Sequence, residues 1–107
     1  MEDSTEIYEV TTIKEIKEGD FILAEFKGGT RNKSTYKYVC IVQATISDTN
    51  ISVMAMNAID TTHTTFKTNE NDVSIISFNA VLGKLPTPHI GDRVKYIFNI
   101  AINVKEY

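Results

Sequence analysis

Short apolar stretches recur along the chain, separated by glycine and small polar residues, and this pattern predicts strands. Residues 21–26 are apolar except for Glu25 and lie between two glycine-containing breaks. Residues 36–46 are rich in Tyr, Val and Ile, which favour strands, and the turn-forming run Ser-Asp-Thr-Asn follows them. So short a turn favours an antiparallel hairpin with the next strand. The five predicted strands comprise residues 21–26, 36–46, 51–56, 73–76 and 94–105.

The last predicted strand shows the clearest alternation of apolar and polar residues. From Val94 to Val104 every second residue is apolar, and most of the residues between them are polar. A straight strand of this length would span about 40 Å, which is longer than a small sheet needs. We therefore expect a long C-terminal strand that bends around a barrel or extends beyond it.

Two short helical turns are predicted before and after the central strands. The spacing of threonine and glutamate in residues 12–15 is that of a capping box, and Gly19 ends the turn that follows. Ser77 is an expected N-cap for residues 78–82, and Gly83 is placed to end that turn. Neither turn is long enough to change the fold class.

Five strands, glycine-rich turns and almost no helix predict an all-β fold, a small five-stranded antiparallel SH3-like barrel, because closure removes exposed sheet edges. An OB-fold is the second architecture. It usually inserts a longer helix, whereas residues 57–72 lack a helical apolar period and predict a loop with at most one short paired segment. We expect an acidic lead-in segment at residues 1–16 and the barrel at residues 17–107.

Composition limits the classes of protein that remain. A chain of 107 residues with 42% hydrophobic residues is sized for one domain. Its net charge of -3 excludes a protein that coats nucleic acid wholesale. No apolar run approaches the roughly 18 residues of a membrane-spanning helix, and Cys40 is the only cysteine, as is usual in a reducing compartment. We expect an intracellular protein, nuclear or cytoplasmic.

Charge is nevertheless uneven along the sequence. One stretch of eleven residues holds four bases and no acid, and it ends beside Tyr36 and Tyr38. These bases and rings would suit a single-stranded nucleic acid, with phosphates on the bases and nucleobases on the rings, or an acidic peptide. The alternative is a solvated loop. The basic residues of the stretch are Lys27, Arg31, Lys33 and Lys37.

The sequence offers poor candidates for catalysis. His63 and His89 have no neighbours at a metal-ligand spacing, so we expect no metal site. Cys40 lies in an apolar strand, where free cysteines usually act as small hydrophobes. No phosphate-binding glycine motif is present in the sequence. We therefore expect a protein that is not an enzyme and that needs no cofactor.

Several stretches resemble the Tudor domain, in the order in which that family has them. Residues 19–26, GDFILAEF, resemble the first Tudor strand, and residues 38–42, YVCIV, resemble the second. Residues 51–56 resemble the third strand, and residues 73–86 resemble the closing strand, helical turn and Leu-Pro. The chain is also similar to a Tudor-like module of arthropod transposon-derived proteins. The resemblance covers about residues 17–90.

The resemblance implies an aromatic box that holds methylated arginine or lysine by cation–π attraction. By position, Phe26 and Tyr38 would be two of its walls. Residues 55–60, AMNAID, lack the two aromatic residues of the family, so Tyr36 or Phe66 would have to replace them. The alternative is that Phe26 and Tyr38 pack on the barrel rim. The family also implies a chromatin, RNA-silencing or mobile-element context.

Our leading hypothesis is a non-enzymatic module that binds a peptide segment or partner protein. A second hypothesis is nucleic-acid or acidic-peptide binding through the basic stretch. A third is a homodimer in which the C-terminal strand, with Ile100 and Ile102, pairs with its own copy. No membrane contact is expected. The expected contact surface of the leading hypothesis comprises Phe26, Tyr36, Tyr38 and Phe66.

Overall fold

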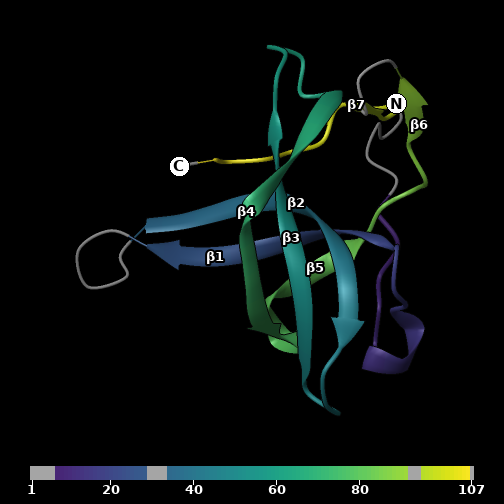
Figure 1. Cartoon of the computed structure of the whole chain (residues 1–107), viewed down its shortest axis with the longest axis vertical. Coiled ribbons are helices and arrows are strands. Elements are labelled where there is room, and N and C mark those ends of the chain that lie inside the picture. Colours follow the sequence, from purple (N-terminus) through teal and green to yellow (C-terminus); the bar gives the residue numbers. More distant parts are fainter. Residues whose placement is uncertain (1–6, 29–33, 92–94, 107) are drawn as a thin grey trace.

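The computed structural model describes residues 7–28, 34–91 and 95–106, and it is all-β, as predicted (Figure 1). Within these residues seven strands form one antiparallel sheet in the order β5-β1-β2-β3-β4-β7-β6. Among the described residues no pairing joins β5 to β6, so the sheet is not closed. None of the described residues forms a helix long and apolar enough to cross a membrane. The elements are η1 (Ile13–Glu15), β1 (Phe21–Gly28), β2 (Ser34–Thr45), β3 (Asn50–Ala58), β4 (Thr65–Ser77), η3 (Phe78–Ala80), β5 (Val81–Lys84), β6 (His89–Gly91) and β7 (Lys95–Ile97).

The hairpin predicted from the second and third apolar stretches is confirmed. β2 and β3 pair antiparallel. In the turn between them the Ser47 hydroxyl accepts hydrogen bonds from the backbone amides of Thr49 (3.3 Å) and Asn50 (3.2 Å). The predicted Ser77 cap is also confirmed, because its hydroxyl accepts a 3.2 Å hydrogen bond from the Asn79 amide at the start of η3.

The predicted long C-terminal strand is wrong. Val94 lies outside the described residues, and within residues 95–106 only Lys95–Ile97 forms a strand. From Phe98 to Glu106 the chain follows an irregular path with one isolated bridge. The apolar residues of this stretch pack against the sheet instead of extending it: Phe98 is 3% exposed and Ile102 is 1% exposed. The alternation of apolar and polar residues therefore indicated that one side of this segment is buried. An irregular segment can bury one side just as a strand can.

The strand count and the predicted loop also need correction. In the described residues the sheet has seven strands rather than the predicted five, and the two that were not predicted are β5 and β6. β5 spans Val81–Lys84, so the predicted helical turn over residues 78–82 ends at Ala80, and Gly83 lies within a strand that pairs with β1. β6 pairs with β7, which in turn pairs with β4. The predicted loop at residues 57–72 is largely strand: β3 runs to Ala58 and β4 begins at Thr65. The sequence did not predict this pairing because the first half of β4 carries many polar side chains, several of which are exposed to solvent.

Both faces of the central strands are buried, because alternate side chains point to opposite sides of a sheet. Strands β4 and β5 both contribute to one core, through Ile76 and Val81, so the sheet curls around it. The first core comprises Ile16, Ile22, Ala24, Cys40, Val42, Ile51, Val53, Ala55 and Ile76. The second core comprises Leu23, Val39, Met56, Phe66, Leu85, Phe98 and Ile102.

The C-terminal segment, residues 98–106, covers the second core. The Phe98 ring lies edge-on to the Phe66 ring, with centroids 5.7 Å apart. The segment is held to the β3–β4 turn by backbone hydrogen bonds, from the Phe98 amide to the Thr64 carbonyl (2.8 Å) and from the Ile102 amide to the His63 carbonyl (2.9 Å). The segment thus closes one face of the sheet without joining it as a strand.

Residues 7–16, the described part of the expected lead-in segment, contact the sheet. Tyr8 and Lys84 exchange two backbone hydrogen bonds of 2.8 Å, which places Tyr8 along the edge of β5. Ile16 is 3% exposed and lies in the first core. The predicted helical turn is present as η1, and Gly19 follows it with a φ of 90°, a conformation that glycine adopts without strain.

Candidate interaction surfaces

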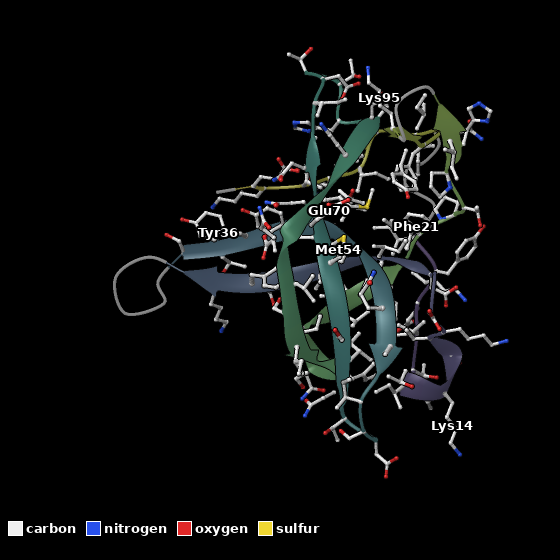
Figure 2. The ribbon with its side chains drawn as sticks, viewed as in Figure 1. Lys14, Phe21, Tyr36, Met54, Glu70 and Lys95 are labelled. Carbon is white, nitrogen blue, oxygen red and sulfur yellow. The ribbon has the colours of Figure 1, made fainter. Side chains whose placement is uncertain are left out.

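Three of the predicted contact residues, Phe26, Tyr36 and Tyr38, lie on one face of the β1–β2 hairpin, and we call them the aromatic face. Phe26 is the cross-strand partner of Tyr36, and Tyr38 lies two residues further along β2. The Phe26 and Tyr38 rings meet edge to face with centroids 5.6 Å apart. All three residues are half-buried. Figure 2 shows Tyr36 on the arm of the hairpin, away from the middle of the sheet.

The C-terminal segment reaches this face. Lys105 exchanges two backbone hydrogen bonds with Lys37 of β2, at 2.9 and 3.0 Å. The Lys105 ammonium nitrogen lies 6.0 Å from the centroid of the Tyr36 ring, within the range of a cation–π attraction. Sequence reasoning placed Lys105 on a long strand and missed its role here, because the contact depends on the chain folding back.

The basic stretch is described only in part. Lys27 is exposed and Lys37 is half-buried, and they lie on neighbouring strands with Glu25 as the cross-strand partner of Lys37. Lys105 adds a third lysine beside them. The predicted contact residues Arg31 and Lys33 lie outside the described residues. The described lysines therefore gather on the arm of the hairpin, with Lys27 and Lys37 on the side opposite the aromatic face.

Phe66, the fourth predicted aromatic contact, belongs to the second core. It is 0% exposed and packs against Phe98, so it offers no surface to a ligand. In residues 55–60, where the Tudor resemblance would place two further aromatic walls, Ala55 and Met56 are buried, Asn57 and Ala58 are half-buried and Ile59 is exposed. Among the residues that the sequence suggested as replacement walls, only Tyr36 stands beside Phe26.

A carboxylate orders the β3–β4 turn. Asp60 accepts hydrogen bonds from the hydroxyls of Thr62 (2.6 Å) and Thr64 (2.7 Å), and from the backbone amides of Thr64 and Thr65 (both 3.2 Å). Partial desolvation opposes ionisation of this carboxyl, but the hydrogen bonds outweigh it and hold the pKa of Asp60 well below its usual range. The turn also carries His63 at a φ of 58°. The network is structural.

Groups suited to catalysis are scattered. Cys40 is fully buried, and burial, with a smaller effect from the charge of Asp72, raises the pKa of its thiol to about 12. His63 and His89 are exposed on different elements. Across residues 7–28, 34–91 and 95–106 no three His, Cys, Asp or Glu side chains gather as metal ligands would.

A hollow of about 560 Å³ lies at the β3–β4 hairpin. The residues that line it are Asn57, Ile59, Lys67, Thr68, Asn69, Glu70 and Asn71.

The structure also reveals an apolar strand edge that the sequence analysis did not single out. Val73 and Ile75 of β4 are 49% and 62% exposed. Residues 73–83 contain no charged side chain, which was the one signal in the sequence for an unprotected edge. The pattern alone could not show which side of β4 remains open, because that depends on the sheet order.

Comparisons with protein-family models, with curated proteins and with solved structures found no match to this chain. The surfaces described above therefore carry the functional argument.

Proposed function

We propose that this chain is a non-enzymatic protein-interaction module that binds a segment of a partner protein at the aromatic face. The observation that supports this most is the gathering of Phe26, Tyr36 and Tyr38 on one side of a hairpin arm, half-buried and beside Lys105. Aromatic side chains of this kind provide large contact areas and lose little conformational entropy on binding.

We further propose that the first five strands are an SH3-like frame related to Tudor domains. The order β5-β1-β2-β3-β4 supports this, together with a 3₁₀ turn, η3, that links β4 to β5. In this proposal β6, β7 and the C-terminal segment are additions that cover the outer face of the frame. A shared fold does not identify the ligand, so the ligand has to be inferred from the residues on the surface.

The charge around the aromatic face favours an acidic segment as its ligand. Lys105 stands beside this face, with its ammonium nitrogen 6.0 Å from the Tyr36 ring centroid. Lys27 and Lys37 alternate with the aromatic residues along β1 and β2, so they point to the other side of the hairpin. A methylated arginine would bring a second positive charge to the same ring, which like-charge repulsion disfavours. A partner segment with aromatic or aliphatic side chains and a carboxylate would be attracted by both the rings and Lys105.

The test is a chemical-shift titration of the isotope-labelled chain with three peptides of equal length. One carries carboxylates and an aromatic residue, one has the carboxylates replaced by amides, and one carries dimethylarginine. We expect shifts at the aromatic face with the acidic peptide alone. Tyr36→Ala should lower affinity at least about tenfold. Tyr8→Ala, at an exposed tyrosine beside β5, should change it less than about twofold.

Each other result of the titration bears on the proposal. Shifts with the dimethylarginine peptide alone would replace the acidic ligand with a methyl-mark reader. Shifts confined to residues away from the aromatic face, or equal losses in the Tyr36 and Tyr8 variants, would overturn the proposed site.

A second candidate function is the binding of single-stranded nucleic acid at the same arm. The observation that favours it is the pairing of Lys105 with Lys37, which adds a cation to the basic stretch next to an aromatic ring. Phosphates would contact the lysines and a nucleobase would stack on Tyr36. The overall charge of -3 means that any such binding depends on this local cluster.

Fluorescence anisotropy with labelled oligothymidine, measured over a series of salt concentrations, separates this candidate from peptide binding. The slope of log affinity against log salt is about -0.7 for each phosphate contact on a single strand. Lys105→Ala should reduce that slope by about 0.7. Lys14→Ala removes an exposed lysine on η1, far from Tyr36 in Figure 2, and should leave the slope unchanged. Binding that ignores salt would exclude the nucleic-acid candidate.

A further inference from the structure

The later part of β4 is an open edge of the sheet. One side of β4 pairs with β3 up to Ser77, whereas the other side pairs with β7 only at Thr65 and Phe66. In Figure 1 the lower part of β4 forms a margin of the sheet. Within the part of the chain that the structure describes, no strand pairs with residues 73–77 on that side. This edge is separate from the aromatic face.

The register identifies the backbone groups that point outward. The Phe78 amide donates a 2.7 Å hydrogen bond to the Thr49 carbonyl, and in the same register Ser77 faces Asn50. Antiparallel pairs alternate between bonded and non-bonded positions, so residues 74 and 76 bond to β3. The backbone N–H and C=O groups that face the open side therefore belong to Val73, Ile75 and Ser77.

The side chains at this edge do not protect it. Val73 and Ile75 are 49% and 62% exposed, and Ser77 is exposed as well. No lysine, glutamate or proline interrupts residues 73–77. Edge strands in soluble proteins usually carry a charge, a proline or a bulge that prevents another strand from adding to them. The stretch is therefore suited to accept a strand.

We propose that the occupant of this edge is a second copy of the chain, with the two β4 strands antiparallel about a two-fold axis at Ile75. In that register Ile75 meets Ile75 of the second copy, and Val73 meets Ser77. All the outward backbone groups are then paired, which gives about six hydrogen bonds across the interface. Glu70 and Asp72 lie at opposite ends of the joined strands, so their charges do not meet.

The other sheet edges explain why β4 pairs with itself. At β5, Tyr8 already exchanges both backbone hydrogen bonds with Lys84, so a head-to-tail contact between β4 and β5 is obstructed. The remaining end strand, β6, spans three residues, His89–Gly91. Symmetric contacts in which a surface meets its own copy are also the commonest arrangement of homodimers.

The first test is the mass in solution by light scattering over a concentration series. We expect the wild-type mass to rise from 12.0 kDa toward twice that value. Ile75→Lys should hold it at 12.0 kDa, because it places two like charges at the axis. Ile90→Lys is the matched control, since Ile90 is also 62% exposed and lies on β6, and its mass should double as in the wild type.

Two further measurements make the test specific to this register. Ile75→Glu should also be monomeric, and a mixture with Ile75→Lys should regain the doubled mass because opposite charges then meet at the axis. Amide hydrogen exchange at high concentration should slow at residues 73, 75 and 77. Residues 74 and 76, already bonded to β3, should exchange at the same rate at low and high concentration.

Several results would overturn the proposal. A wild-type mass of 12.0 kDa at every concentration would exclude self-pairing and leave the edge to a strand of another protein. Doubling that survives in Ile75→Lys, or that Ile90→Lys abolishes equally, would place the interface elsewhere. A mass that grows beyond two copies would mean open-ended stacking instead of a closed pair.

Discussion

The backbone amide of Ala58, at the end of β3, donates a 2.8 Å hydrogen bond to the side-chain carboxylate of Glu106. Lys105, the residue before Glu106, exchanges two backbone hydrogen bonds with Lys37 of β2. β2 and β3 do not pair with each other at this level. The end of the C-terminal segment therefore joins two strands that do not pair with each other there.

Removing the Glu106 carboxylate should weaken this junction. We expect Glu106→Ala to lower the free energy of unfolding by about 1 kcal/mol, because the Ala58 amide loses a charged acceptor. Glu106→Gln, which keeps an acceptor oxygen, should lose less. Glu70→Ala, at an exposed glutamate on β4, should change it by less than about 0.5 kcal/mol. Urea denaturation measures all three, and equal losses at both positions would contradict the junction.

Asp60 should make the β3–β4 turn sensitive to acid. Its pKa is lowered in the folded chain from the ordinary value of 3.8, so its contribution to stability is present above that value and is lost as the pH falls toward the lowered pKa. We expect Asp60→Asn to lose less stability than the wild type between about pH 5 and pH 2. At pH 7 the variant should be about 1 kcal/mol less stable, because solvent screens the carboxylate. Parallel stability curves against pH would show that Asp60 has no such role.

The site of Gly83 should not tolerate even the methyl side chain of alanine. A Cβ atom there would collide with Ile7 Cγ2 and would lie 3.3 Å from the Tyr8 carbonyl oxygen. We expect Gly83→Ala to cost about 1–3 kcal/mol. Adding Ile7→Ala should recover part of this loss, a non-additive effect of about 1 kcal/mol. Gly91→Ala is the milder control, because its Cβ would come closest to the flexible tip of the Ile97 side chain, at 3.0 Å. Additive effects of the two changes would mean that the N-terminal residues do not pack here.

Cys40 should react with thiol reagents only when the chain opens. Its side chain is fully buried and its pKa is raised to about 12, so the thiolate is scarce in the folded state at neutral pH. We expect an aromatic disulfide reagent at pH 8 to label it slowly in buffer and rapidly in denaturant. Labelling at the rate of a free thiol peptide, without denaturant, would show that the first core is not closed.

The sequence predicted most central elements because their signals are local. The apolar run after Gly19 and the turn around Ser47 identified β1 and the β2–β3 hairpin. The C-terminal stretch was misassigned because Phe98 and Ile102 pack on a sheet face that only the completed fold creates. Periodicity detects a buried side, and it does not say whether the backbone that buries it is paired.

The candidate surface was predictable to a similar extent. The Tudor resemblance placed Phe26 and Tyr38 together, and their ring centroids do lie 5.6 Å apart, because β1 and β2 pair in a register that puts both on one face. The sequence around Phe66 did not indicate that this side chain is buried, because its neighbours in the sequence are polar. Its packing partner Phe98 lies 32 residues later. Long-range contacts of this kind decide burial and are absent from local patterns.

The position of Phe98 and Ile102 also sets an order on synthesis. The residues of the first core are complete once Ile76 has been made, whereas the second core waits for Ile102. At the usual rates of translation this interval is about 1–5 s. During that time Leu23 and Val39 lack the part of their cover that Phe98 and Ile102 provide. A nascent chain at this stage presents an apolar surface of the kind that chaperones bind.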